Sequence, residues 1–268
     1  MTNIAIYTFN SGNDTLPTFN EGYIYAYTDV DNGDNTITRT ITSDTLPNSI
    51  SFRGKTGLIS VSYLDTSNVT NMKYMFTDCI SLTLLDVSGF NTSKVTDMYA
   101  MFYGCESLTS LDVSSFDTSN VTSMYAMFYN CTNLTILDVS GFNTSKVTNM
   151  SYMFASCTNL TSLNVSNLDT SNVTTMDSMF SDCESLTSLD VSNFNTSNVT
   201  DMDYMFYNCT NLTSLDLNNL DTSNVTNMDY MFDNCNNLNL INMKNSDVDS
   251  INDIITVLTT RIAEAQVL

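Results

Sequence analysis

The chain has 268 residues, with no His, no Trp, two Pro and eight Gly, but sixteen Met and seven Cys. Its 29 Asp and Glu outnumber its 8 Lys and Arg, so the formal net charge at pH 7 is −21. The lack of histidine excludes Ser-His-Asp and Cys-His catalytic sets and histidine metal ligands. The acidic balance argues against nucleic acid and anionic membranes as partners, since both attract basic proteins.

Residues 1–64 differ in kind from the rest of the chain. Both Pro and five of the eight Gly lie here, and residues 23–27 and 37–41 alternate in the manner of strands. Asn32-Gly33 lies between these two runs, and this dipeptide is a strong hairpin signal. We therefore predict a small β unit that caps the first coil of the region that follows. It is also a candidate module for attachment to a virion or for assembly into a homo-oligomer.

Residues 65–246 consist of seven copies of a 26-residue unit, [D/N]-T-S-x-V-T-x-M-x-x-M-F-x-x-C-x-x-L-x-x-L-[D/N]-V-S-x-[F/L], with limited changes. The cysteines mark the period: Cys79, Cys105, Cys131, Cys157, Cys183, Cys209 and Cys235. Fourteen of the sixteen Met occupy two positions of the unit. A unit this short cannot bury its own apolar side chains, so successive units must stack as coils.

Each unit contains one predicted strand and one predicted helical turn. Leu85 and Val87 lie in an L-x-x-L-x-L frame and would face inward from a short strand. The M-x-x-M-F-x-x-C run has i, i+3, i+4, i+7 spacing, which predicts one or two turns of α- or 3₁₀-helix. The predicted fold class is an α/β repeat solenoid. It is a right-handed leucine-rich-repeat solenoid of seven 26-residue coils with a parallel β-sheet, a small N-terminal β cap and a C-terminal capping helix. A parallel β-helix without helical turns is the alternative.

Residues 247–268 predict an amphipathic helix. Apolar side chains recur along one helical face: Ile251, Ile254, Ile255, Leu258 and Ile262. Asp249 or Ser250 can serve as the N-cap. Such a helix would cover the open end of the last coil, which would otherwise invite edge-to-edge association. A helix that binds a partner is the alternative.

The order M-F-x-x-C-x-x-L-x-x-L resembles the repeat of BspA-like, treponemal-type leucine-rich-repeat surface proteins. The fuller D-T-S-x-V-T-x-M-x-x-M-F-x-x-C form resembles the subfamily found in bacterial surface lipoproteins, and the resemblance covers residues 65–246. It implies a surface protein that binds other proteins or cells, and it brings no catalytic residues that could be assigned to this sequence. Anchored members carry a signal peptide, a lipobox cysteine or a sorting tail, and none is visible in this sequence. Related repeats occur in phage proteins, so a virion component is the alternative.

Stacking would turn each position of the unit into a ladder with rungs about 5 Å apart. Parallel rungs hold Cβ atoms too far apart for disulfides, and a linear ladder cannot surround a zinc ion. The cysteines are therefore predicted to be small buried thiols.

Two acidic ladders accompany the strands and turns. One lies between inward Leu and Val and should face outward: Asp86, Asp112, Asp138, Asn164, Asp190, Asp216 and Asn242. The other alternates strictly between Asp and Asn, from Asp65 to Asp221, which doubles the spacing between its charges. Like charges directly opposite each other destabilise a sheet. Calcium bridging Asp86, Asp112 and Asp138 is therefore a hypothesis, and no other cofactor is predicted.

Two rows of threonine never vary, Thr66 to Thr222 and Thr70 to Thr226. Regular hydroxyls on a flat solenoid could match an ice lattice, so ice binding is a further hypothesis. Alternatively, these hydroxyls satisfy backbone groups in a tight turn that every coil contains.

Positions that change between coils are better binding candidates, because packing does not dictate them. Early coils carry four tyrosines beside the Met-Phe turn: Tyr99, Tyr103, Tyr125 and Tyr129. Later coils carry acids at the position of Tyr99 and Tyr125: Asp177, Asp203 and Asp229. Tyrosine is a favoured anchor at interfaces, although neutral drift on a solvated face would give the same pattern.

The predicted protein is a non-enzymatic binding or adhesion module displayed at a surface. It would recognise a protein or glycan on a cell surface through a rigid acidic face of the solenoid. The alternative is a virion structural or host-recognition protein, such as a decoration, fibre or tail component. The expected location is extracellular, on a cell surface or on a virion, without membrane insertion and without nucleic acid as partner.

Overall fold

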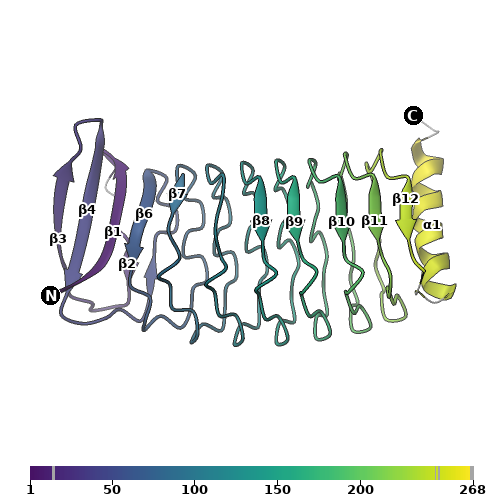
Figure 1. Cartoon of the computed structure of the whole chain (residues 1–268), viewed down its shortest axis with the longest axis horizontal. Coiled ribbons are helices and arrows are strands. Elements are labelled where there is room, and N and C mark those ends of the chain that lie inside the picture. Colours follow the sequence, from purple (N-terminus) through teal and green to yellow (C-terminus); the bar gives the residue numbers. More distant parts are fainter. Residues whose placement is uncertain (14–15, 245, 247, 266–268) are drawn as a thin grey trace.

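The computed structural model describes residues 1–13, 16–244, 246 and 248–265, and only the backbone for residues 260–265. The chain forms an elongated stack (Figure 1). The N-terminal β unit lies at one end, the short strands of successive repeats lie in a row, and helix α1 (Val248–Ala265) lies at the other end.

The N-terminal unit is a mainly antiparallel sheet that pairs with the first repeat. Its long strands are β1 (Thr2–Asn10), β3 (Ala26–Asp31), β4 (Thr36–Ser43) and β6 (Leu58–Leu64). With β7 (Leu84–Leu85) of the first repeat, the order is β3-β4-β1-β6-β7, while β2 (Thr18–Phe19) and β5 (Ile50–Ser51) form a separate pair. The hairpin predicted at Asn32-Gly33 is confirmed, because β3 and β4 pair antiparallel on either side of it. The central strand β1 was not predicted.

Residues 50–64 extend the stack into the N-terminal unit. Phe52 stacks on Phe76 of the first repeat, with ring centroids 5.7 Å apart and an interplanar angle of 6°. The Phe52 N–H donates to the Met75 carbonyl over 2.7 Å, and β6 pairs in parallel with β7. The first repeat is thus covered in the same way as the later ones, and the sequence boundary at residue 65 is not a gap in packing.

Successive repeats pair in parallel with an offset of 26 residues. Their strands are β8 (Ile136–Asp138), β9 (Ser162–Asn164), β10 (Ser188–Asp190), β11 (Ser214–Asp216) and β12 (Leu240–Asn242). Ser188 pairs with Ser214, and Ser214 pairs with Leu240, so the predicted parallel pairing is confirmed. The predicted single sheet is instead interrupted, with β8-β9 and β10-β11-β12 as separate groups and Ser110 joined to Ile136 by an isolated bridge. The right-handed course of the coils stays a prediction.

A column of stacked phenylalanines runs through the core. Its members are buried and stand one repeat apart: Phe76, Phe102, Phe128, Phe154, Phe180, Phe206 and Phe232. Adjacent ring centroids lie 5.5–5.9 Å apart, with interplanar angles of 0–16°. Each ring is buried by the coils next to its own, so a coil is stable only within the stack.

The helical turn predicted at M-x-x-M-F-x-x-C is wrong, because residues 65–244 contain no helix. In the first repeat the Cys79 N–H donates to the Phe76 carbonyl, three residues earlier, as in a β-turn. The N–H groups of Tyr74 and Phe76 instead donate to the carbonyls of Tyr99 and Met101 in the next coil, over 2.9 and 2.8 Å. An α-helix would use such donors internally, whereas here they join the coils. The repeats therefore match the alternative without helical turns.

Two positions of each turn adopt positive φ. The second of them, just before the cysteine, holds Asp78, Gly104, Asn130, Ser156, Asp182, Asn208 and Asn234, with φ of 56–68°. Glycine, asparagine and aspartate adopt this left-handed region most easily. The composition of this column is thus the sequence signature of the turn.

The predicted burial of the seven cysteines is confirmed, and all are free thiols. Each Sγ lies 2.9–3.2 Å from the carbonyl oxygen of a phenylalanine in the preceding coil, as Cys131 does from Phe102. Burial raises the pKa of Cys157 to about 12, so its thiol is protonated and unreactive near neutral pH. The cysteine therefore supplies a small apolar group and a weak donor to a turn carbonyl.

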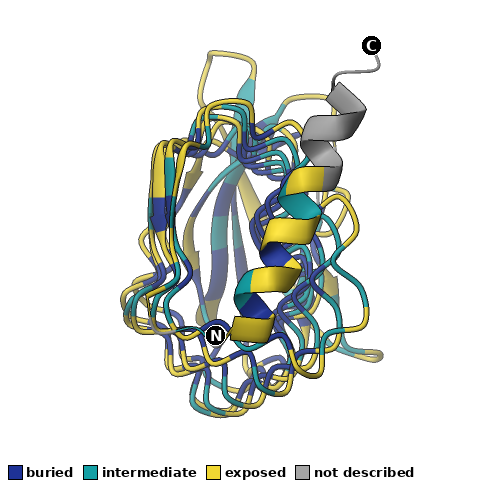
Figure 2. Ribbon diagram, turned by 90° about the vertical axis from the view of Figure 1, so that its right-hand side faces the viewer, coloured by how far each residue is buried: buried dark blue, intermediate teal, exposed yellow. Residues whose placement is uncertain are grey.

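Helix α1 lies across one side of the C-terminal end of the stack (Figure 2). Ile254 is buried, and Ile251 and Leu258 are half-buried, as predicted for the inward face. Ile255 was predicted to share that face but is 53% exposed. The side chain of Ile262 lies outside the described residues. No helix in the described part of the chain combines the length and the apolar character needed to cross a membrane.

The predicted N-cap of this helix is wrong. Asp249 and Ser250 both lie inside α1, which begins at Val248. The Ser250 Oγ is instead buried against the last repeat, where it accepts the Thr222 N–H over 3.0 Å. This bond ties the first turn of the helix to the last coil, because it satisfies a backbone donor there.

Candidate binding surface

One flank of the stack is built from the M-x-x-M-F-x-x-C turns, and its outer positions vary between coils. Because the turns stack in register, residues 26 apart form columns along this flank. The first variable column, one residue after the first Met of each turn, holds Lys73, Tyr99, Tyr125, Ser151, Asp177, Asp203 and Asp229. All four predicted tyrosines and the three predicted aspartates therefore lie on one flank.

Six half-buried tyrosines of the first four repeats form the tyrosine ridge: Tyr74, Tyr99, Tyr103, Tyr125, Tyr129 and Tyr152. The rings of Tyr99 and Tyr125 stack with centroids 4.6 Å apart and an interplanar angle of 12°. Those of Tyr103 and Tyr129 stack at 4.7 Å and 14°. Tyr152 contacts both Tyr125 and Tyr129, which joins the two stacks. The ridge is therefore one connected aromatic surface.

Two basic side chains lie on the N-terminal end of the ridge. The Lys73 ammonium lies 4.3 Å from the ring centroid of Tyr99, and the Arg53 guanidinium lies 4.2 Å from that of Tyr74. Burial, followed by the nearby Tyr125, raises the pKa of Tyr99 to about 12. The phenol therefore stays protonated at physiological pH. Since stacking and the cations cover ring faces, the ridge offers mainly ring edges and hydroxyls.

The three aspartates continue the first variable column into the later repeats. The Asp177 Oδ1 accepts the Thr175 hydroxyl over 2.7 Å. Asp203 lies between the other two, and its Oδ1 is buried without a hydrogen-bond partner. Burial raises the pKa of Asp203, a hydrogen bond with Asn227 opposes this, and the nearby charges of Asp201, Asp229 and Asp177 add to the rise. The column is therefore an acidic strip whose middle carboxyl group has a raised pKa.

Asp203→Asn is expected to stabilise the protein by about 1 kcal/mol at neutral pH, because it removes a charge from an unsatisfied buried acceptor. The melting temperature should rise by about 2–4 °C. An acid whose folded pKa is raised destabilises the fold above that pKa, and the penalty fades as the pH falls through it. Calorimetry from neutral to acidic pH should therefore show the gain shrinking.

The matched control for this prediction is Asp177→Asn, which alters a carboxylate of the same column that already accepts a hydroxyl. It should give a clearly smaller gain, because it removes only the repulsion between Asp177 and Asp203. An equal rise in both variants would mean that net charge, and not the environment of Asp203, limits stability.

A family model described as "Mycoplasma protein of unknown function, DUF285" matches residues 46–162 and, again, residues 130–246. The chain belongs to the DUF285 family. A crystal structure of a leucine rich cell surface protein from Faecalibacterium prausnitzii A2-165 is similar at 18% sequence identity and a TM-score of 0.30. That similarity covers 75% of this chain and 76% of the other. No curated protein matches the sequence.

The outward acidic ladder of the DUF285 repeats caps turns. Asp86, Asp112 and Asp138 are exposed, as predicted, and each Oδ1 accepts the N–H of the serine two residues later over 2.9–3.0 Å. Hydrogen bonds from that serine, its hydroxyl first, lower the pKa of each carboxyl. Within the described residues, no three acidic or cysteine side chains converge as metal ligands do. The calcium hypothesis stays a prediction that a calcium titration of the melting temperature would test.

The two threonine rows of the DUF285 repeats differ in position. Thr66 to Thr222 are buried, and their hydroxyls bond to backbone groups of the next coil, or for Thr222 to α1. Thr70 to Thr226 are exposed, and from Thr122 onward each hydroxyl donates to the carbonyl of the preceding threonine. The first row therefore cannot face an ice lattice, and the predicted ice-binding array is reduced to the second.

The flank also holds aromatic residues that the sequence did not single out. Tyr74 and Tyr152 complete the ridge, although they occupy the column next to that of Tyr99. Near the C-terminal end, Tyr204 stacks on Tyr230 at 4.8 Å and meets Tyr207 edge-on at 5.3 Å. The sequence did contain a signal for these residues, since tyrosine is rare elsewhere in the repeats. Comparing only residues that are 26 apart did not group tyrosines that belong to different columns.

Proposed function

We propose that this protein is a non-enzymatic recognition module that binds a protein partner through the tyrosine ridge and the adjoining acidic strip. The observation that carries the proposal is the in-register stacking of Tyr99 on Tyr125 and of Tyr103 on Tyr129. Because the rings are already held in place, binding loses little side-chain entropy. Rigid tyrosines are typical anchors at protein interfaces.

The chemistry of the ridge favours a protein over a glycan. Sugars stack on exposed ring faces, whereas these rings cover one another and present hydroxyls and edges. Protonated phenols both donate and accept hydrogen bonds, which suits peptide groups. The acidic strip of Asp177, Asp203 and Asp229 would attract basic side chains of the same partner and speed its approach.

Display at a cell surface is part of this proposal. It is supported by the resemblance of the repeat to those of BspA-like surface proteins of the DTSxVTxMxxMFxxC subfamily. A virion component is the alternative, and immunogold labelling of producing cells and of purified particles would distinguish the two.

The test measures retention of host-surface extracts on the immobilised full chain. The wild type should retain material that protease treatment of the extract removes and glycosidase treatment does not. A variant with Tyr99, Tyr103, Tyr125 and Tyr129 replaced by serine should retain at least tenfold less, since aromatic anchors each contribute roughly 1–2 kcal/mol or more.

Two variants that lose the same amount of charge distinguish binding by the acidic strip from a general effect of net charge. Replacing Asp177, Asp203 and Asp229 by asparagine should weaken binding, whereas the same change at Asp86, Asp112 and Asp138 on the sheet face should not. Equal weakening in both would mean that only net charge matters. Retention that survives the tyrosine changes, or that is lost with glycosidase, would contradict the proposal.

A further inference from the structure

Strand β3 forms an open edge at the N-terminal end of the stack. In the order β3-β4-β1-β6-β7 it pairs only with β4, and all six of its residues are exposed. Tyr27 is 47% exposed and Val30 is 61% exposed. Figure 1 shows β3 at the opposite end of the molecule from α1. No other described strand or helix covers this edge.

The backbone of β3 is available for a further strand. The Asn32 N–H donates to the Thr36 carbonyl over 3.1 Å, which fixes the alternation of the antiparallel ladder. Thr28 therefore bonds to β4, while the peptide groups of Tyr27, Asp29 and Asp31 point away from it. Natural edges are usually protected by charged side chains, especially lysine, by proline or by a bulge. β3 contains no lysine or proline and pairs with β4 in unbroken register, and the charge of its Asp29 is paired with Arg39.

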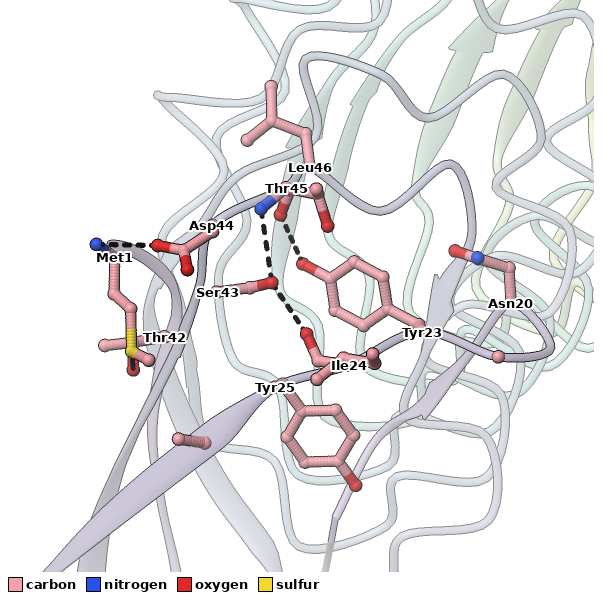
Figure 3. Close-up of a pocket in the computed structure, with 12 residues that line it drawn as sticks. Met1, Asn20, Tyr23, Ile24, Tyr25, Thr42, Ser43, Asp44, Thr45 and Leu46 are labelled. Carbon is pink, nitrogen blue, oxygen red and sulfur yellow. Dashed lines mark hydrogen bonds and ion pairs between the residues drawn. The ribbon is translucent and has the colours of Figure 1, made fainter.

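The edge is also held in place before any partner arrives. Arg39 binds both carboxylate oxygens of Asp29 at 2.7 Å and lies 4.2 Å from the ring centroid of Tyr27. Just before β3, the Ser43 Oγ donates to the Ile24 carbonyl and the Tyr23 hydroxyl donates to the Thr45 carbonyl, each over 2.7 Å (Figure 3). A partner strand would thus find a preformed template.

We propose that β3 pairs antiparallel with β3 of a second copy of this chain, with Thr28 at the two-fold axis. The two N-terminal sheets would then become one continuous sheet across the dimer. This is an isologous interface, in which the same strand serves both copies.

The register follows from the side chains. Two β3 strands can form hydrogen bonds only where residues whose peptide groups point away from β4 lie opposite each other. Every second register is therefore excluded. Of the remaining registers, two keep five residues of each β3 paired, one centred on Asp29 and one on Thr28. The first sets two Asp29 side chains directly opposite each other, which destabilises a sheet. The second sets Tyr27 of each copy opposite Asp29 of the other and Ala26 opposite Val30, so it is the favoured one.

The distribution of charge also favours a second copy at this end. Residues 1–64 contain six acidic and three basic side chains, whereas residues 65–246 contain nineteen acidic and four basic ones. Pairing through β3 places the two repeat regions at opposite ends of a rod. The strongly acidic parts of the copies are then as far apart as the molecule allows, which minimises their repulsion.

The test is sedimentation velocity of the full chain over a concentration series. The 29.8 kDa chain should form a dimer with a micromolar Kd, because one strand pair buries less surface than a standard interface. Thr28→Lys or Thr28→Glu alone should weaken the dimer at least tenfold, because like charges then meet at the axis. A mixture of the two variants should restore it.

Thr40→Lys is the matched control, since Thr40 pairs with Thr28 on β4 but lies one strand away from the proposed interface. It should leave the dimer intact. A wild type that stays monomeric at high concentration would overturn the proposal. Dimers that tolerate both Thr28 variants, or a mixture that stays monomeric, would exclude pairing centred on Thr28.

Discussion

Phe154→Ala is expected to lower the free energy of unfolding by about 3–5 kcal/mol, the usual cost of removing a fully buried phenyl ring. Phe154 is fully buried at the centre of the phenylalanine column, 5.8 Å from Phe128 and 5.7 Å from Phe180. A cavity there removes contacts on both sides of one coil. Because each coil contacts only its neighbours, urea unfolding followed by circular dichroism should also lose its single sharp transition.

Two substitutions of phenylalanine by leucine, one outside the phenylalanine column and one within it, provide the control. Phe142→Leu should cost less than about 1.5 kcal/mol, because Leu168 and Leu220 already occupy the equivalent position in other coils. Phe154→Leu should cost more, since all seven repeats have phenylalanine in its column. If the two leucine variants are equally stable, the stacked column has no special role in holding the coils together.

The core could be predicted because burial follows directly from the repeat. A 26-residue unit leaves its apolar side chains no partner except the same positions in the next unit. Phe154, Cys131 and Val87 therefore lie inward, as the repeat requires. The same reasoning predicted that Asp86 faces outward, between the inward-facing Leu85 and Val87.

The turns could not be predicted from apolar spacing, because i, i+3, i+4, i+7 is shared by a helix and by this series of β-turns. The deciding information lay in the polar column of Asp78, Gly104 and Asn130, whose residues tolerate positive φ. The residues of that column favour β-turns, whose backbone N–H groups can bond to the next coil, over a helical turn. The N-terminal coil made by Phe52 was missed for a related reason, since its unit departs from the 26-residue pattern.

The candidate site was predicted only in part. Column alignment brought Tyr99 and Tyr125 together, and the structure places their rings in contact. Tyr74 and Tyr152 join the ridge from the neighbouring column, because long aromatic side chains reach across backbone positions. Strand alternation alone also gave no sign that β3 would lie at an open edge, since edge position depends on the order of strands in the sheet.

Thr118→Val is expected to cost about 2–3 kcal/mol, although the two side chains are nearly the same size. The buried Thr118 hydroxyl donates to the Asn143 carbonyl over 3.0 Å and accepts the Asn143 N–H over 2.8 Å. Valine removes both bonds and leaves two backbone groups of the next coil without a partner, each of which carries a desolvation penalty. Thr118→Ser keeps the hydroxyl and should recover most of the loss in urea unfolding.

Thr122→Val separates this structural role from a surface role for the second threonine row. Thr122 is exposed, and its hydroxyl donates over 3.1 Å to the Thr96 carbonyl, which also accepts the Thr122 N–H over 2.9 Å. Valine therefore orphans no backbone group, and stability should stay within about 0.5 kcal/mol of the wild type. If the exposed row bound ice, thermal hysteresis of the wild type would be measurable and would fall in this variant. If the hydroxyls only support the turns, neither protein should show hysteresis, and only Thr118→Val should be destabilised.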